Sequence, residues 1–227
     1  MSEKENLNIK DYSWLAIEGI VASIPTVGPA LQTAYFGRKS EKRFKRIENF
    51  YNDLSQHVQE LQDQMVTKTE IEKYSDQIAE FMEKSNDLVE SDVQGFKSAL
   101  LRNAFLTILK SPSEVNWNEE QYFTSTIGQM DTTDFQVLGA ARNGGWVQVK
   151  SVIDFFNGKL DRFYLKGLCE RLTSLGYFEK RYGNINMQGE GTIIDTYYRI
   201  SNLGQNLLSF TMKPPIKKET NGNNTKP

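Results

Sequence analysis

The sequence predicts a mainly helical protein, in which a helical N-terminal region is followed by a smaller C-terminal domain with a β-hairpin. Two observations support this fold class. Apolar residues recur at intervals of three and four over much of residues 44–108, which is the spacing of helices that bury one face. From residue 131 onward, three short helical patterns precede two β-rich runs and a last helical pattern. The composition, with 38% hydrophobic and 25% charged residues, is ordinary for a globular protein.

The most apolar stretch of the chain is Trp14–Gly37. It runs for 24 residues with a single charge, at Glu18, and that length could span a bilayer. Pro25 and Pro29 oppose one straight helix, because each removes a backbone donor and clashes with the preceding turn. We therefore predict an N-terminal arm over residues 1–13 and an apolar helical hairpin over residues 14–37. This hairpin either packs on the rest of the protein or lies against a membrane.

A basic run follows the hairpin directly, from Arg38 to Arg46. It holds six basic residues and one acid, Glu41. The run is either a solvated helix start or a patch that binds the phosphates of lipid headgroups or of nucleic acid. An apolar segment beside a polybasic run is typical of proteins that act at an anionic membrane surface. The candidate patch comprises Arg38, Lys39, Lys42, Arg43, Lys45 and Arg46.

A helix of three heptads begins within this basic run. Its apolar residues alternate by three and four, as the a and d positions of a coiled coil do: Phe44, Ile47, Tyr51, Leu54, Val58, Leu61 and Met65. The pattern suits a long helix of a bundle as well as a coiled-coil-like seam between two chains. A homodimer through Phe44–Met65 is therefore one hypothesis. His57 lies beside the seam, and we expect it at the rim rather than as a ligand.

Two further helices complete a predicted bundle over residues 38–110. Capping-box patterns at Thr67 and at Ser91 mark where they begin. The second of them is expected to bury Val93 together with Phe96 and Leu100. Between residues 47 and 110 the chain carries twelve acids and six bases, so the bundle is acidic and its entrance is basic. Residues 111–130 are predicted to be a linker with a short helix, because they begin with the turn-forming sequence SPSEVNWN.

Three helices are predicted at the start of the C-terminal domain, which we place at residues 131–212. Asp131 caps the first helix, and Gly144-Gly145 ends it. The second ends at Asn157-Gly158. Asp161 caps the third, whose C-terminus is expected at Gly176, a position that favours the left-handed conformation of glycine. The inward residues of the second and third helices are Val149, Val152, Ile153, Phe156, Leu165, Leu168, Leu172 and Leu175.

A hairpin and one more helix follow. We expect a first strand at Tyr177–Tyr182, a turn at Gly183-Asn184, a loose loop to Gly191 and a second strand at Thr192–Ile200. Ser201 caps the last helix. This order of elements resembles the winged variant of the helix-turn-helix, in which the hairpin is the wing. The polar tail over residues 213–227 is expected to be disordered.

The third helix and the first strand hold the candidate nucleic-acid contacts. Between residues 161 and 181 there are five bases and three acids, a weakly basic balance for a DNA reader. Glu170, near the centre of the outward face, would repel phosphates. The candidate contacts are Arg162, Lys166, Arg171, Lys180 and Arg181. The alternative is a winged helix that binds a protein partner or forms a dimer.

The sequence offers little for catalysis or metal binding. It contains one cysteine, Cys169, and one histidine, His57, which we place in different domains. A structural zinc site needs about four ligands, and no paired-carboxylate motif stands out, so we expect no enzyme activity, no cofactor and no metal. Cys169 follows Leu165 by four residues and is expected to be a small buried hydrophobe.

Several short motifs suggest a family. They are the turn at Ile24–Gly28 in an apolar segment, the basic helix start at Lys42–Ile47, an acidic helix with Leu54 and Leu61, and the closing Ile200–Gly204 before a short helix and a Lys-Pro tail. In these features the chain resembles the abortive-infection alpha family of bacterial phage-resistance proteins. The resemblance implies a role in defence against bacteriophage, and it implies no catalytic residues.

The leading hypothesis is a non-enzymatic, cytoplasmic phage-defence protein that acts by binding, with its winged helix in contact with DNA or a protein partner. The first ten residues, MSEKENLNIK, lack the basic-then-apolar order of a signal peptide. One alternative is a membrane-associated effector that inserts its apolar N-terminal hairpin. Another alternative is a winged-helix transcriptional regulator.

Overall fold

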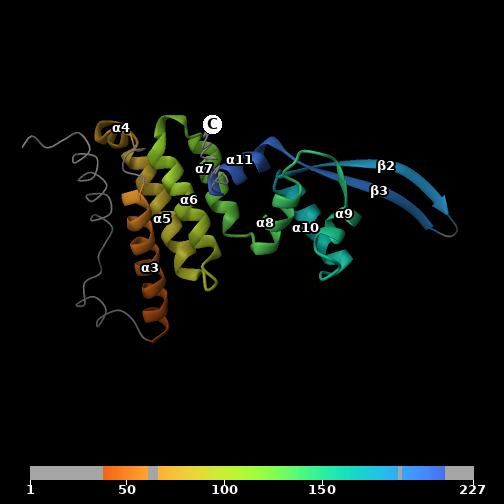
Figure 1. Ribbon diagram of the computed structural model, residues 1–227, viewed down its shortest axis with the longest axis horizontal. Coiled ribbons are helices and arrows are strands. Elements are labelled where there is room, and N and C mark those ends of the chain that lie inside the picture. The colour runs from red at the N-terminus through yellow and green to blue at the C-terminus, as the bar shows by residue number, and fades with distance from the viewer. Residues whose placement is uncertain (1–37, 61–65, 189–190, 213–227) are drawn as a thin grey trace, which may run out of the picture.

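The computed structural model describes residues 38–60, 66–188 and 191–212 (Figure 1). The predicted arm, the apolar hairpin at residues 14–37 and the tail at residues 213–227 lie outside the described residues. Within them the chain is mainly helical with one small antiparallel sheet. In order, the elements are α3 (Arg38–Glu60), α4 (Lys68–Lys73), α5 (Ser75–Ser91), α6 (Phe96–Lys110), the 3-10 turn η2 (Pro112–Glu114), α7 (Trp117–Ile127), α8 (Thr132–Ala140), β1 (Val147–Gln148), α9 (Val149–Phe155), α10 (Arg162–Ser174), β2 (Phe178–Gln188), β3 (Gly191–Ile200) and α11 (Asn202–Thr211).

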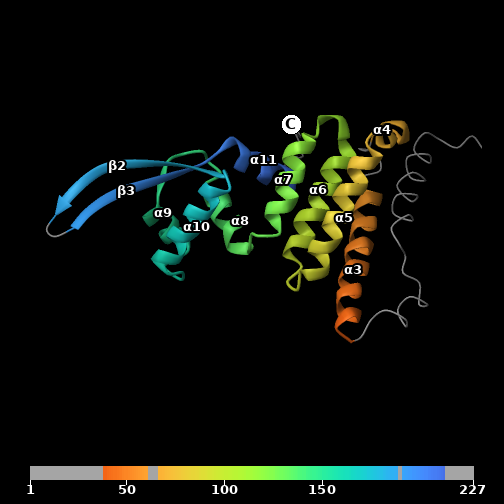
Figure 2. The same ribbon diagram turned by 180° about the vertical axis from the view of Figure 1, so that it is seen from behind.

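The molecule is helical at one end and ends in a β-hairpin at the other. Helices α3, α5, α6 and α7 stand side by side as a bundle at one end, and the β2–β3 hairpin projects from the other (Figures 1 and 2). Helix α8 follows the bundle, and α9 and α10 lie against the base of the hairpin (Figures 1 and 2). Helix α11 follows the hairpin and leads back toward the bundle, where it packs on α6. No helix within the described ranges is long and apolar enough to cross a membrane.

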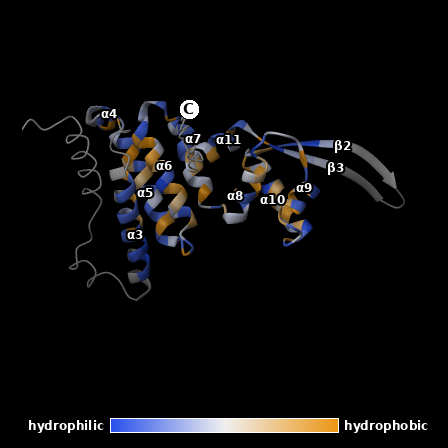
Figure 3. Cartoon of the chain, viewed as in Figure 1, coloured by the Kyte–Doolittle hydropathy of each residue, from blue (hydrophilic) through white to orange (hydrophobic). Residues whose placement is uncertain are grey.

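Helix α3 packs on α5 and α6 through the described part of the predicted seam. Leu54 and Val58 are completely buried, and the Tyr51 hydroxyl donates to Asn86 Oδ1 on α5 at 2.6 Å. Hydrophobic residues are concentrated on α5 and α6, whereas the edge helix α3 is mostly hydrophilic (Figure 3). The described part of the seam, Ile47–Val58, therefore packs within its own chain. The dimer contact along Phe44–Met65 stays a prediction, because Phe44, Leu61 and Met65 have no described side chains.

The segment after Thr67 forms two helices where the sequence suggests one. The Thr67 side chain caps α4 as predicted, by accepting from the Glu70 backbone N–H. Tyr74 then leaves helical geometry, with φ −113° and ψ 17°, and its ring stacks on Trp117 at 6.0 Å. Ile71 of α4 and Ile78 of α5 are both buried in the core.

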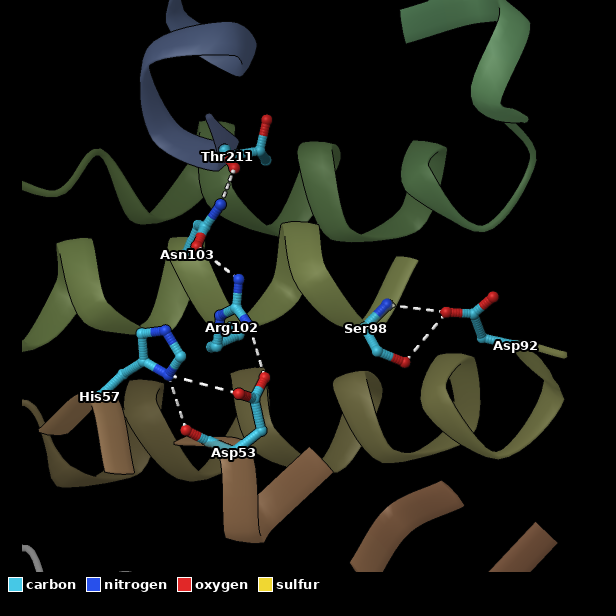
Figure 4. A network of polar contacts seen from close by, with 7 residues as sticks. All are labelled: Asp53, His57, Asp92, Ser98, Arg102, Asn103 and Thr211. Carbon is cyan, nitrogen blue, oxygen red and sulfur yellow. Dashed lines mark hydrogen bonds and ion pairs between the residues drawn. The ribbon is translucent and has the colours of Figure 1, made fainter. Parts of the chain in front are cut away.

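The predicted helix start at Ser91 is wrong. Ser91 is the last residue of α5, and α6 begins at Phe96. The cap comes from the buried Asp92, whose carboxylate accepts from the backbone and hydroxyl of Ser98 at 2.8 and 2.9 Å (Figure 4). Val93 consequently lies in the connection and is 82% exposed rather than buried.

Polar contacts tie three helices together inside the bundle (Figure 4). Arg102 on α6 pairs with Asp53 on α3. The neighbouring Asn103 donates to the backbone oxygen of Thr211 on α11 at 2.9 Å. His57 lies at the rim as expected, with Nδ1 2.8 Å from the Asp53 backbone oxygen. The C-terminal helix is thereby attached to the N-terminal bundle.

Residues 111–130, expected as a linker, contribute to the same core. Phe123 and Ile127 of α7 are buried. The Thr126 hydroxyl is hydrogen-bonded to the hydroxyl of Tyr177, which precedes β2 and is itself fully buried. Helix α7 therefore joins the bundle to the C-terminal elements through packed side chains.

Helices α8, α10 and α11 begin where the sequence predicts. The side chains of Asp131, Asp161 and Ser201 cap them by accepting backbone N–H groups of the first turn. Gly176 follows α10 with φ +72°, a conformation that a residue with a Cβ adopts at a cost. These helix ends depend on residues within one helical turn, so their positions can be predicted from the sequence.

The sheet contains one strand that the sequence does not reveal. Its order is β1-β3-β2, and all neighbours are antiparallel. Strand β1 has two residues, and it pairs Val147 with Tyr198 and Gln148 with Tyr197. A two-residue strand is too short to show an alternating pattern.

The predicted hairpin turn at Gly183-Asn184 is wrong. Strand β2 runs through this pair to Gln188, and the register shifts between Tyr182 and Ile185, which marks a bulge. A Cβ on Gly183 would lie 2.5 Å from Cε2 of Tyr197 on β3. The glycine is thus explained by the close approach of a neighbouring ring, and the hairpin is longer than expected.

Candidate nucleic-acid interface

Helix α10 presents one face to the core and one to solvent. Leu165, Leu168 and Leu172 are buried, and so is Cys169, as expected. Burial, and next the nearby charge of Glu170, raise the pKa of the Cys169 thiol to about 12, so the group is not a reactive thiolate near neutral pH. The outward face carries the candidate contacts.

Two of the five predicted contacts, Arg162 and Lys166, are exposed on this face. Arg162 has no ion pair or hydrogen bond with any described residue. Lys166 lies near enough to Glu170 to lower the pKa of that carboxyl. Both side chains point from the first half of α10, so both are available to a phosphate.

Arg171 has a different role from the one expected. Its guanidinium pairs with Asp134 of α8, and its Nε donates to Asp134 Oδ1 at 3.2 Å. Asp131 lies 3.6 Å from the same guanidinium. Hydrogen bonding to Asp134 raises the pKa of Arg171. The Asp134 side chain is fully buried, so Arg171 compensates a buried charge and holds α10 on α8.

Lys180 is also engaged within the protein. Its ammonium donates to both carboxylate oxygens of Glu170 at 2.7 and 2.8 Å. The Tyr198 hydroxyl donates to the same carboxylate at 2.7 Å. Burial favours a higher pKa for Glu170, but the hydrogen bonds from Lys180 and Tyr198 outweigh it and lower that pKa. The acid that the sequence places at the centre of the face is therefore neutralised locally.

Arg181 lies on the opposite face of the sheet from Lys180. Its guanidinium carbon is 4.4 Å from the centroid of the Trp146 ring and 5.2 Å from that of Tyr197. The guanidinium carbon of Arg199 lies 4.8 Å from a Trp146 ring centroid, and Arg199 pairs with Glu179 across the strands. These cation–π contacts brace the base of the hairpin.

Two cations that sequence reasoning missed lie on the segment that leads into α10. Lys150 is exposed on α9, and Lys159 is exposed in the connection to α10. Neither forms an ion pair with a described residue. They precede the predicted reading helix, and only the fold brings α9 and α10 side by side (Figure 1). We call the four cations Lys150, Lys159, Arg162 and Lys166 the corner cations.

The connection between these helices is a tight turn. Asn157 and Gly158 adopt left-handed conformations, with φ +53° and +66°. The turn is closed by backbone hydrogen bonds, among them Lys159 N to Phe156 O at 3.0 Å. Asp161 then accepts from the first N–H groups of α10, so that helix end is occupied and any anion must be held by side chains.

The basic run at residues 38–46 is largely the first turns of α3. Arg43 pairs with Glu90 at 3.2 Å, and Lys45 pairs with Glu48 at 2.6 Å. Arg46 donates to the backbone oxygen of Glu90. Lys42 is exposed, while the side chains of Arg38 and Lys39 lie outside the described residues. Part of the predicted phosphate patch thus serves to join α3 to the end of α5.

Two further kinds of candidate site are a cluster of metal-ligating side chains and a hollow between α7 and α11. Among the described residues, no cluster of histidine, cysteine and carboxylate side chains could hold a metal ion. A hollow of about 440 Å³ between α7 and α11 is bordered by Glu119 and Glu120. Burial raises the pKa of Glu120, whose Oε1 accepts from the Thr124 hydroxyl at 2.7 Å, and Asn206 donates to Glu119 at 2.9 Å.

The chain matches no family model, no curated protein and no solved structure.

Proposed function

We propose that residues 131–212 form a winged helix that binds nucleic acid through the corner where α9 meets α10. The order α8, β1, α9, α10, β2, β3, α11 and the sheet order β1-β3-β2 support this fold. In such an arrangement α10 is the helix that enters a groove, and the β2–β3 hairpin is the wing.

The corner cations carry the proposal. Four exposed positive side chains on α9, on the connection and on α10 are available to phosphates, and with the two acids of residues 150–166 the segment has a net charge of +2. Of these acids, Asp161 caps α10 and Asp154 is exposed on α9. The positive charge is local, because the chain as a whole has a formal net charge of −2.

The set of contacts proposed from the sequence changes accordingly. Arg162 and Lys166 remain, and Lys150 and Lys159 join them. Arg171, Lys180 and Arg181 instead stabilise the unit through Asp134, Glu170 and Trp146. A protein that makes about four phosphate contacts binds duplex DNA weakly, and its affinity falls steeply with salt.

The resemblance to the abortive-infection alpha family suggests the setting for this binding. In that setting the protein is a non-enzymatic component of bacterial defence against bacteriophage. A transcriptional regulator would bind DNA through the same corner. Measurements of binding to mixed-sequence DNA therefore apply equally to a defence protein and to a regulator.

The test is charge reversal at the corner. Binding of a labelled mixed-sequence duplex is measured by fluorescence anisotropy between about 50 and about 300 mM salt, the range over which phosphate contacts weaken most visibly. Lys166→Glu with Arg162→Glu should lower the affinity at least tenfold and reduce the salt slope by about 2, close to one unit for each phosphate that is no longer neutralised.

The matched control reverses two exposed lysines on the bundle, Lys73 and Lys110, and so produces the same change in net charge. It should bind as the unchanged protein does. Equal weakening in both double variants would mean that the affinity follows overall charge, and the corner would no longer be the binding site. Absence of duplex and single-strand binding in the unchanged protein would reject the proposed function.

A further inference from the structure

Three aromatic rings stand in solvent on the same segment as the corner cations. Phe163 is 80% exposed, Phe155 is 57% exposed, and Tyr164 is 44% exposed. They account for half of the large hydrophobic side chains exposed among the described residues. Burying such rings would stabilise the protein by the hydrophobic effect. A group of exposed rings is therefore typical of a surface that binds a ligand.

The fold places Phe155 at the start and Phe163 and Tyr164 just past the end of one short connection. Phe155 is the last residue of α9, and Phe163 is the second residue of α10. The turn at Asn157 and Gly158 reverses the chain between them. Phe155 also rests edge-on against the half-buried Phe156, with ring centroids 5.1 Å apart and planes at 87°. This edge-to-face contact favours one position of the Phe155 ring.

Rings and cations together fit one chemistry better than others. Phosphates of a duplex need cations, but its bases are stacked on one another and offer only their edges in the grooves. Unpaired bases offer whole faces, and each can stack on an aromatic side chain while the backbone lies along basic residues. The corner supplies both components, with Lys159 and Arg162 between Phe155 and Phe163 in the chain.

We propose that the corner binds single-stranded nucleic acid, with unpaired bases stacked on Phe155 and Phe163 and the backbone held by the corner cations. This proposal rests on the proposed function, since it names the ligand class of the same site. Tyr164 borders the surface and can add a third stacking position.

The experiment compares a labelled oligo(dT) of about 30 nucleotides, long enough to cover one such site, with a mixed-sequence duplex of the same length. The key variant is Phe155→Leu with Phe163→Leu. Leucine keeps an exposed apolar side chain but has no aromatic face, so the change isolates stacking from hydrophobic contact. Both positions are exposed, and the fold should be kept, as circular dichroism can check.

The double leucine variant should bind oligo(dT) at least about fivefold more weakly, the lower end of what the loss of one stacked base costs. Duplex binding should change less than twofold. Val93→Ala is the control, because Val93 is 82% exposed on the bundle, away from the corner. It should leave both affinities unchanged.

Other outcomes separate this inference from the proposed function. If duplex binding depends on Lys166 and Arg162 but the leucine variant binds oligo(dT) normally, stacking is disproved and the proposed function stands. If the duplex binds more tightly than oligo(dT) by tenfold or more, the single-strand preference is overturned as well. If neither nucleic acid binds, both proposals fail, and the corner belongs to a protein partner.

Discussion

The guanidinium of Arg171 on α10 pairs with the fully buried carboxylate of Asp134 on α8. Asp134 also accepts from the backbone N–H of Asp131 at 2.8 Å, which completes a capping box. One buried side chain therefore both caps its own helix and attaches the neighbouring helix. A cation that the sequence suggests as a phosphate contact is a part of the fold.

Arg171→Ala should consequently lower stability rather than nucleic-acid affinity alone. It leaves a buried carboxylate without its cation, and we expect the free energy of unfolding to fall by about 1–3 kcal/mol. Urea denaturation followed by circular dichroism measures this. Lys166→Ala, five residues earlier on the exposed face, should change stability by less than about 0.5 kcal/mol. Equal stability of the two variants would contradict the structural role of Arg171.

The limits of sequence reasoning are clearest at this pair. The caps at Asp131 and Asp161 and the stop at Gly176 are predictable, because each depends on residues within one helical turn. The partner of Arg171 lies 37 positions away in the chain. A local charge count gives the sign of a side chain, but it cannot show that the charge is already compensated.

The hairpin shows the same limit for glycine. The pair Gly183-Asn184 has the composition of a turn, and composition alone predicts a turn there. In the structure Gly183 lies in a bulge against Tyr197, a residue fourteen positions later. The contact between α9 and α10 likewise depends on the turn at Asn157 and Gly158, where both residues have positive φ.

A pair of glycine substitutions tests how closely α11 packs. A Cβ on the buried Gly204 would lie 2.5 Å from the backbone oxygen of Tyr177, which cannot move without disturbing the start of β2. Gly204→Ala should therefore lower the free energy of unfolding by about 1–3 kcal/mol, as overpacked cores do.

Gly167→Ala is the counterpart. Gly167 lies in the middle of α10 and is exposed, and a Cβ added there would meet no atom within 4 Å. Alanine should raise the free energy of unfolding by about 0.5–1 kcal/mol, because it restricts the unfolded chain and favours the helix. Thermal denaturation of both variants gives the comparison. Similar effects of the same sign would disprove the close packing of α11.

Stability should fall at alkaline pH. Burial raises the pKa of Cys169 from 9.0 to about 12 and that of Tyr51 from 10.0 to about 12. It also raises the pKa values of Tyr177 and Tyr198. The folded state thus favours the protonated groups. Their contribution is complete below the unfolded values and is lost as the pH rises from about 9 to about 12.

Urea midpoints at about pH 8 and about pH 11 measure this dependence. Tyr51→Phe loses the hydrogen bond to Asn86 and should be less stable at the lower pH. Its further loss of stability at the higher pH should be smaller than that of the unchanged protein, because one titrating group has been removed. Parallel losses in the two proteins would show that Tyr51 does not contribute to the alkaline transition.

Glu170→Gln should strengthen nucleic-acid binding. The carboxylate holds Lys180 through two hydrogen bonds at 2.7 and 2.8 Å and lies one helical turn after Lys166. Glutamine keeps an acceptor for the Tyr198 hydroxyl, so the strand should stay in place. Lys180 neutralises Glu170 in the unchanged protein, so the loss of the negative charge frees Lys180 for a phosphate and makes the α10 face more positive.

We expect the affinity for nucleic acid at about 50 mM salt to rise severalfold and the salt slope to steepen by up to about 1, the effect of one added phosphate contact. Glu179→Gln is the matched control, because Glu179 pairs with Arg199 on the opposite face of the same hairpin. If Glu179→Gln strengthens binding and Glu170→Gln does not, the ligand lies on the Trp146 face of the sheet, and the assignment of α10 as the binding helix is wrong.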